Sequence, residues 1–317
     1  MKLIKPSFEI LEQKPRAIAI PDDMEIGPRK VREELLNSIY RQIEIAGRIC
    51  YKSEDKITED SAKSFVERMI KAGHGAMLEH GTVYLSIPYN EAYSLLPDTN
   101  WVIDSYGKNP YSIIRLHGPH FYITTNYRVL VENGWLDDLK YLCEPTEYHA
   151  KRITVHFVCD RGVSHEFVRH RVFSFAQEST RYCNYSKDKF DSECTFIIPC
   201  WLNIVEGSYT LEDVEEKYDR CLITDSGKGI TNEAAEYIRS LIYSEKTYFS
   251  LLDRNWRPQQ ARAVLPNSLK TELVMTGFVS DWEHFFELRC SSSAHPQARE
   301  LAIPLQEEFI ARGYINN

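Results

Sequence analysis

Residues 169 to 182 bring together the side chains of this chain that are best suited to chemistry: Arg-His-Arg-Val-Phe-Ser-Phe-Ala-Gln-Glu-Ser-Thr-Arg-Tyr. Three arginines, one histidine and two serines fall within these fourteen residues. The planar guanidinium of arginine donates two parallel hydrogen bonds to a pair of phosphate oxygens, and nearby hydroxyl groups can complete the site. In a protein with a net charge of −8, such a local cationic cluster predicts a pocket for a small anionic ligand.

The same segment has a second interpretation. It could be a helix whose arginines face solvent and pair with Glu166 and Glu178, an arrangement that contributes little to stability. In the functional interpretation, the guanidinium groups bind the phosphate of a nucleotide, and Gln177 or Glu178 contacts an edge of its base. The density of arginines alone leaves both interpretations open.

Other motifs are weaker. His165 and His170 in His-Glu-Phe-Val-Arg-His are five residues apart, which places them roughly 140° apart on a helix, so they cannot share one metal ion. The segment 225–231 lacks the first glycine of a phosphate loop, and no dinucleotide-binding glycine motif follows a strand. Cys183, next to Arg181, could be an activated thiolate, but a half-buried thiol without a role is the favoured interpretation. We expect no metal site.

The composition is that of an ordinary globular enzyme, with 317 residues of which 43% are hydrophobic and 26% are charged. The acidic balance argues against a protein that coats nucleic acid. Its eight cysteines include no Cys-x-x-Cys pair, which favours reduced thiols. We see no signal peptide and no apolar run near the ~20 residues that span a bilayer. These features predict a soluble, cytoplasmic protein without a membrane partner.

Apolar periodicity predicts the elements that position these residues. Helices are expected over 31–51 and from 62 to a cap at Gly73, and Asp160 is placed to cap a helix that leads into the arginines. Asp281 is expected to cap a helix over 281–290. Further helices are expected at 211–222, 230–252 and 295–313, with a flexible 225–229, and strands at 82–88, 153–159, 195–199, 263–266 and 271–278. A strand or turn and then a helix are expected within 120–144. Together they predict a single α+β domain, with mixed helices around a small antiparallel sheet and an insertion at about 88–150.

Four blocks of the sequence resemble one known family. Arg169-His170-Arg171, seven residues and Ser179 reproduce the R-H-R-x7-S signature of the flavin-dependent thymidylate synthases, and the match extends to Tyr182. The other blocks, in the family's order, are GHGAMLEHG (73–81), ARAVLP (261–266) and FFELRCSSSAHPQAREL (285–301), and AGRICY (46–51) is a weaker fifth match.

The resemblance implies an enzyme that converts dUMP to dTMP. In this family, methylenetetrahydrofolate gives the carbon, reduced FAD gives the hydride, and NADPH reduces the flavin. Family members are homotetramers whose active sites are shared between subunits, so the resemblance also implies self-association. C5 of uracil is a poor nucleophile until negative charge builds up in the ring, and a cation near the base stabilises that charge.

The resemblance assigns this catalytic role to Arg289. It implies that Ser179, Arg181 and Arg262 hold the phosphate of dUMP, with no nucleophilic role for Ser179. The full set of implied dUMP contacts is Glu166, Phe167, Val168, Arg169, Gln177, Glu178, Ser179, Thr180, Arg181, Arg262 and Arg289. The implied FAD contacts are His74, Glu79, Arg169, His170, Arg171, Gln177 and His284.

The chain departs from the family pattern at several positions. Ala176-Gln177 replace the usual Asn-Glu, and Glu166 replaces a common Gln, so Glu166 must be protonated or paired with an arginine. Cys50 stands where the family usually has Ser. The positions of three further flavin contacts hold Phe278, Ser280 and His284.

Three questions remain open at this point. The segment Thr124–Arg128 of the insertion could reach the site, although a simple strand and turn is favoured. A non-catalytic protein that binds nucleotide or RNA phosphates could use the same arginines. A thymidylate synthase that depends on Cys183 is the enzymatic alternative.

Overall fold

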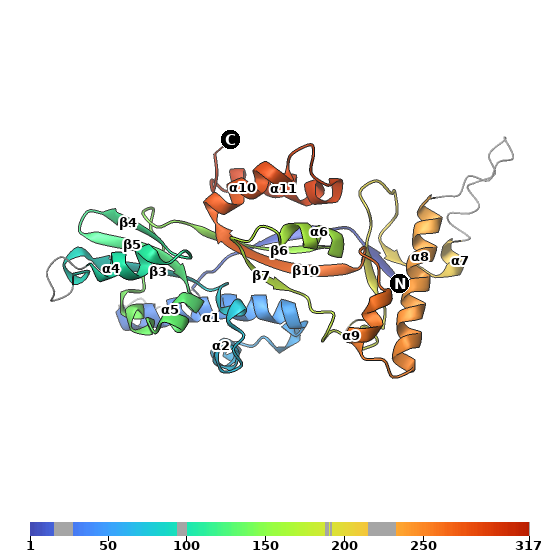
Figure 1. Cartoon of the computed structure of the whole chain (residues 1–317), viewed down its shortest axis with the longest axis horizontal. Helices are drawn as coiled ribbons and strands as arrows, with labels where there is room; N and C mark the ends of the chain where they lie inside the picture. Colours follow the sequence, from blue (N-terminus) through green and yellow to red (C-terminus); the bar gives the residue numbers. More distant parts are fainter. Residues whose placement is uncertain (16–27, 94–99, 188–189, 191, 215–232, 317) are drawn as a thin grey trace, which may run out of the picture.

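The computed structural model describes residues 1–15, 28–93, 100–187, 190, 192–214 and 233–316. At its centre lies an antiparallel sheet in the order β2-β6-β10-β7 (Figure 1). These strands are Ser7–Leu11, Arg152–Asp160, Lys270–Phe278 and Ser174–Gln177. Leu273 of β10 pairs with Phe157 of β6 on one side and with Gln177 of β7 on the other.

Helices cover both faces of this sheet. Helices α10 (Val279–Arg289) and α11 (Pro296–Ala311) lie on one side, and α1 (Pro28–Tyr51) and α2 (Ser61–Lys71) on the other (Figure 1). Alternate residues of β10 therefore enter different cores: Leu273 packs in the cluster that contains Trp282, whereas Val274 packs in the cluster of α1. Burial on both faces explains the continuous apolar run Leu273, Val274 and Met275 in the middle of this strand.

A second sheet, in the order β3-β5-β4, is built largely from the segment 88–150. Its strands are Thr82–Pro88, His120–Asn126 and Ile113–His117. The same region contains α4 (Trp101–Ser105), α5 (Tyr127–Asn133) and the 3-10 helices Tyr89–Glu91, Tyr106–Lys108 and Leu136–Tyr141. This second sheet shares the α1 core with the central sheet, which ties the segment to the rest of the protein.

A third sheet joins β8 (Thr195–Ile197), β1 (Lys2–Ile4) and β9 (Gly207–Ser208). It packs with α8 (Glu233–Asp253) in a separate apolar cluster. The remaining helices are α3 (Gly75–Leu78), α6 (Arg161–Phe167), α7 (Leu211–Val214), α9 (Pro258–Ala261) and the 3-10 helices Glu54–Lys56 and Arg262–Val264. Within the described residues, no helix is long and apolar enough to cross a membrane.

The predicted α+β class is confirmed, and most predicted elements are present. Helix α2 ends where expected: Gly73 has φ +69°, and the N–H of His74 donates to Met69 O at 2.9 Å. This is the left-handed cap that glycine favours. The described residues do not test whether 88–150 is an insertion relative to the family, so that remains a prediction.

One predicted strand is absent, and one predicted helix begins earlier than expected. Residues 263–266 do not form a strand, because the chain turns in a 3-10 helix over Arg262–Val264. Helix α10 begins two residues before Asp281, whose carboxylate accepts the N–H of Phe278 at 2.8 Å from inside the first turn. Of the helix expected at 211–222, only Leu211–Val214 is described. The remainder, together with the flexible 225–229 and the rejected phosphate-loop motif at 225–231, lies outside the described residues.

Candidate active site

The arginine segment is divided between two elements. The side chain of Asp160 accepts the N–H of Val163 at 2.7 Å and so starts α6, as predicted. Arg169 and Arg171 follow on the turn after α6, and β7 then leads to Ser179 and Arg181. The segment is therefore not the continuous solvent-facing helix of the alternative interpretation.

The predicted catalytic arginine lies at the end of α10 and is held by Glu166 of α6 and His170 of the arginine segment. Arg289 Nη1 donates to Glu166 Oε2 at 2.6 Å and Nη2 to Glu166 O at 2.8 Å. Arg289 Nε donates to His170 Nε2 at 2.9 Å. We call Arg289, Glu166 and His170 the Arg289 cluster. Pairing with an arginine is one of the two states expected for Glu166.

The histidine of this cluster is neutral. Burial lowers the pKa of His170 to about 4, and the neighbouring Arg289, His284 and Arg169 act in the same direction. Because Arg289 Nε is a donor, His170 Nε2 must accept, so the ring proton is on Nδ1. The ring of His284, a predicted flavin contact, lies 6.4 Å from that of His170, and its side chain is largely exposed.

One predicted phosphate ligand, Arg262, lies beside Thr180, which is a predicted dUMP contact. Arg262 Nη1 donates to Thr180 Oγ1 at 2.8 Å, and the Ser179 N–H donates to Cys50 O at 3.1 Å. Arg181 and Arg262 are exposed, and neither forms an ion pair with an acid in the part of the chain that the structure describes. Both guanidinium groups can therefore donate hydrogen bonds to a phosphate without first losing an ion pair.

Gln177 and Glu178 make protein contacts instead of facing an open site. Gln177 Nε2 donates to Ser164 Oγ at 2.8 Å. Glu178 is only 2% exposed, and its carboxylate lies 2.9 Å from Lys270 Nζ and accepts from Tyr185 Oη at 3.2 Å. The structure thus places the Glu178 carboxylate in a buried network, not beside the exposed arginines.

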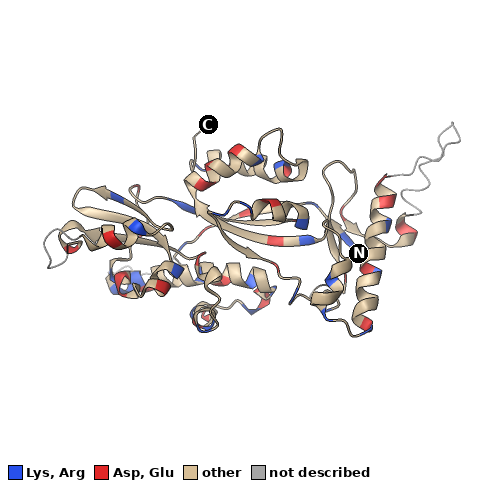
Figure 2. Cartoon of the chain, in the orientation of Figure 1, with Lys and Arg blue, Asp and Glu red and all other residues tan. Residues whose placement is uncertain are grey.

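We call Lys270, Glu178, Glu272, Lys52 and His156 the Lys270 network. Glu272 lies 2.6 Å from Lys270, 2.9 Å from Lys52 and 2.9 Å from His156. Burial favours the neutral carboxyl group, but His156, Lys270 and Lys52 outweigh it and hold the pKa of Glu272 well below its usual range. Burial likewise opposes the charge on Lys270, and Glu178 with Glu272 raises its pKa. The first three residues of β10 include one basic and one acidic residue, Lys270 and Glu272, and Figure 2 shows the two charges close together at that end of the strand.

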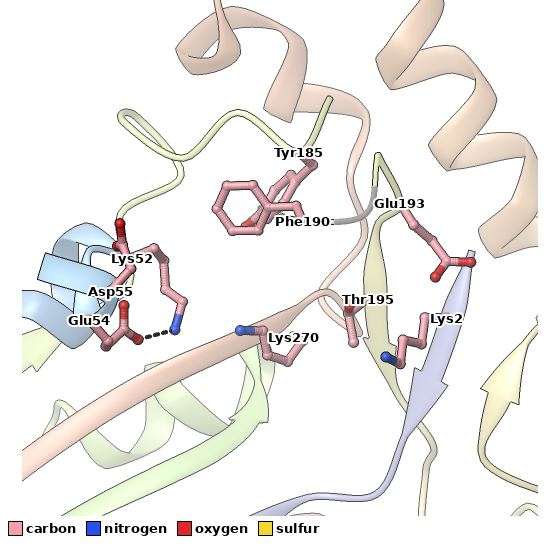
Figure 3. Close-up of a pocket in the computed structure, with 9 residues that line it drawn as sticks. All are labelled: Lys2, Lys52, Glu54, Asp55, Tyr185, Phe190, Glu193, Thr195 and Lys270. Carbon is pink, nitrogen blue, oxygen red and sulfur yellow. Dashed lines mark hydrogen bonds and ion pairs between the residues drawn. The ribbon is translucent and has the colours of Figure 1, made fainter. Parts of the chain in front are cut away.

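A cavity of about 340 Å³ lies beside the network. Figure 3 shows Lys52, paired with Glu54, and Lys270 approaching this cavity from one side, with Tyr185 and Phe190 opposite. Both of these lysines already bind carboxylates, so neither can bind a phosphate here without loss of an ion pair.

Three further predicted flavin residues, His74, Glu79 and Arg171, fall in two places. His74 Nδ1 hydrogen-bonds to Tyr51 Oη at 2.9 Å, and Tyr51 packs edge-on against Tyr182. Glu79 and Arg171 instead line a cavity of about 510 Å³. Other residues that line it include Ala76, Arg152, Phe173, Phe175, Phe278 and Asp281.

Arg152 is a site residue that the sequence interpretation missed. Its guanidinium donates to Glu79 O at 3.1 Å and to Thr82 Oγ1 at 3.3 Å, and the described chain supplies no acidic ion-pair partner for it. Burial lowers its pKa to about 10, while Tyr84, Glu79 and Asp281 oppose the shift, so it remains charged at neutral pH. The signal that could have identified it is an arginine at the start of a largely apolar strand.

Cys183 does not have the environment of a nucleophile. Its side chain is 1% exposed and packs in the apolar cluster of α8. The expected half-buried thiol is thus more deeply buried than predicted, and a reactive thiolate needs access to its substrate.

Fold and site together define an α+β protein with a paired internal arginine and exposed guanidinium groups suited to an anionic ligand. A family model described as thymidylate synthase complementing protein matches residues 145–312, and the chain belongs to this family. The predicted family is therefore confirmed.

Several relatives bear the name flavin-dependent thymidylate synthase. The one from Corynebacterium efficiens is 31% identical over 149 residues, which is 47% of this chain and about half (53%) of the relative. The one from Corynebacterium aurimucosum is 24% identical over 263 residues, covering 82% and 72% of the two chains. A solved structure titled as the UMP/dUMP methylase PolB from Streptomyces cacaoi, bound with 5-Br dUMP, aligns with a TM-score of 0.39 and 15% identity over 98% of this chain and 93% of that one.

Proposed function

We propose that this chain is a flavin-dependent thymidylate synthase that methylates C5 of dUMP. The observation that supports this most strongly is the Arg289 cluster, in which residues more than a hundred positions apart hold one guanidinium in place. Family membership and the names of the relatives support the same activity.

The chain's own residues suit the chemistry of the uracil ring. As C5 attacks the one-carbon unit, negative charge builds up on the ring, and a positioned guanidinium stabilises it. Neutral His170 and Glu166 fix the orientation of Arg289, and only Glu166 offsets its charge. Arg181, Arg262 and Ser179 would bind the phosphate of dUMP and thereby hold the base against Arg289.

The cavity that Glu79, Arg152 and Arg171 line suits a flavin. A volume of about 510 Å³ falls within the ~300–1,000 Å³ of typical small-molecule sites. Phe173, Phe175 and Phe278 supply aromatic surface for a planar ring, and Arg152 with Arg171 supplies cations for a diphosphate. When bound there, FAD would supply the hydride that NADPH provides, in the overall conversion of dUMP, methylenetetrahydrofolate, NADPH and a proton to dTMP, tetrahydrofolate and NADP⁺.

Assembly is part of the proposal. The described residues that line the flavin cavity include no member of the Arg289 cluster and neither Arg181 nor Arg262. A homotetramer with shared active sites, as in the family, would bring such parts together. Sedimentation of the active enzyme as a monomer would contradict this arrangement.

Release of tritium from dUMP labelled at C5 tests the activity. With FAD, NADPH and methylenetetrahydrofolate, we expect release by the unmodified protein and by Cys183→Ala, but not by Arg289→Ala. The purified protein should also bind flavin and show an absorbance band that bleaches with NADPH. A protein that binds dUMP but neither binds FAD nor releases tritium would instead be a non-catalytic nucleotide binder.

A further inference from the structure

An arginine from the segment 88–150 pairs with Glu79, an acid that lines the proposed flavin cavity. Asn126 accepts the N–H of Val129 at 3.2 Å and starts α5, which places Arg128 in the first turn. Arg128 Nη1 then donates to Glu79 Oε1 at 2.5 Å, and Nε donates to Glu132 Oε1 at 2.7 Å. The favoured interpretation of Thr124–Arg128 as a simple strand and turn was therefore incomplete.

The same segment forms one wall of the cavity. Pro110, Tyr111 and Asn126 line it together with Glu79 and Arg171. The segment thus supplies both surface to the cavity and the ion-pair partner of an acid at its edge.

Glu79 is the acid whose charge matters most to this cavity. The carboxylate of Asp281 already accepts the Phe278 N–H at 2.8 Å, and burial raises the pKa of Asp281. Glu79 is only partly buried, and its backbone oxygen binds Arg152. An unpaired Glu79 carboxylate would repel a phosphate-bearing ligand or compete with it for Arg152 and Arg171.

We propose that the Arg128–Glu79 ion pair makes this cavity selective for flavins that carry phosphate. Arg128 neutralises Glu79 and holds it in place, so that Arg152 and Arg171 remain available to phosphate. This role rests on the proposed flavin-dependent function, and it gives the segment 88–150 a part in choosing the cofactor.

Flavin binding to the full chain, freed of bound flavin, tests this role without any assay of catalysis. FAD, FMN and riboflavin are titrated separately and followed by the quenching of flavin fluorescence. Because the exposed pair is partly screened, we expect Arg128→Gln to weaken FAD and FMN binding about tenfold. Uncharged riboflavin should bind within about twofold of its original affinity. Arg128→Lys should retain most of the affinity for FAD.

A double variant separates charge from structure. Arg128→Gln combined with Glu79→Gln removes the uncompensated carboxylate, so its affinity for FAD should return to within about threefold of that of Glu79→Gln alone. Glu132→Gln, which removes the other partner of Arg128, is the matched control and should change FAD binding little.

Gly75→Ala provides a variant that keeps the charges. A Cβ at Gly75 would lie 2.9 Å from Arg128 Nε and 3.2 Å from its Cζ, so the guanidinium must move. We expect a smaller, intermediate loss of FAD affinity with riboflavin binding again preserved.

The possible outcomes are distinct. Equal weakening of all three flavins by Arg128→Gln, or no weakening, would overturn the role of the ion pair while leaving the proposed function intact. Binding of FAD with the expected selectivity but no tritium release would overturn the proposed function alone. If the unmodified protein binds no flavin, both are wrong.

Discussion

The protein contains two groups of charged residues that look alike in composition but differ in how completely they are paired. In the Lys270 network, two lysines and two glutamates balance one another, and the Glu178 side chain is fully buried. In the Arg289 cluster, the Glu166 side chain is 30% exposed and the third member is a neutral histidine.

The difference separates a structural role from a chemical one. A balanced buried network has no uncompensated charge that could bind a ligand. Removal of one member leaves its partners charged and buried without a counter-charge. A guanidinium held by one half-exposed carboxylate and one neutral ring keeps its orientation. Its positive charge is only partly compensated and can still act on a ligand. The comparison predicts that changes in the Arg289 cluster impair activity, whereas changes in the Lys270 network impair stability.

The largest effect is expected from Arg289→Ala. Loss of a positioned group that stabilises developing charge costs about 10²–10³-fold in kcat, and we expect at least this in tritium release. The midpoint of urea unfolding should change little, because Arg289 ends its helix and Glu166 is partly exposed. Arg312→Ala is the matched control, since this exposed arginine pairs with Glu308 and Glu12 far from the cluster. Comparable losses in both variants would contradict the assigned role.

Lys270→Met should have the opposite pattern, with a large loss of stability and a small loss of activity. It leaves Glu178 and Glu272 buried with too little positive charge, and breaking such a pair costs about 3–5 kcal/mol. Urea unfolding should show a correspondingly lower free energy of unfolding. Activity per folded molecule should fall far less than in Arg289→Ala.

A second substitution sharpens this test. Lys270→Met combined with Glu178→Gln removes one of the stranded charges and should recover part of the lost stability. If the double variant is less stable than the unmodified protein by the sum of the two single losses, Lys270 and Glu178 are not coupled and do not form one network.

The sequence predicted the central elements well because each has a local signal. Apolar spacing identified α1, and Asp160 and Gly73 marked the ends of helices through hydrogen bonds to nearby backbone. The apolar run at 263–266 misled because apolar residues in a short turn can pack as well as those in a strand. There, Val264 and Leu265 pack against the α8 core from a 3-10 turn and the segment that follows it.

The sites were less accessible to prediction. Arg289 and Glu166 were identified through the resemblance of their sequence blocks, since nothing local joins residues 123 positions apart. The Lys270 network went unnoticed for the same reason: Lys52 and His156 lie 220 and 116 residues from Glu272. Only the pairing of β6 with β10 and the end of α1 brings them together.

The neutrality of His170 predicts a smaller, pH-dependent effect. Its pKa is about 4 in the folded protein and ~6.5 when unfolded, so the unfolded chain binds the proton first as the pH falls. His170 therefore destabilises the fold progressively between about pH 6.5 and 4, by ~3–4 kcal/mol at most. His170→Gln keeps an acceptor for Arg289 and cannot titrate. We expect urea unfolding of this variant to depend less on pH in that window, with no difference in pH dependence above pH 7.

Cys183→Ala should have the smallest effect on both activity and stability. Cys183 belongs to neither the Arg289 cluster nor the Lys270 network, so this variant is a control for both. Removing a buried sulfur without a charged role should cost about 1 kcal/mol or less of stability. Tritium release per folded molecule should remain within about twofold, because a thiol packed among the apolar side chains of the α8 core cannot reach a substrate held at Arg289 or Arg262. A large loss of activity at unchanged stability would mean that the chain rearranges to expose this thiol, and the catalytic role would then pass from the guanidinium to a cysteine nucleophile.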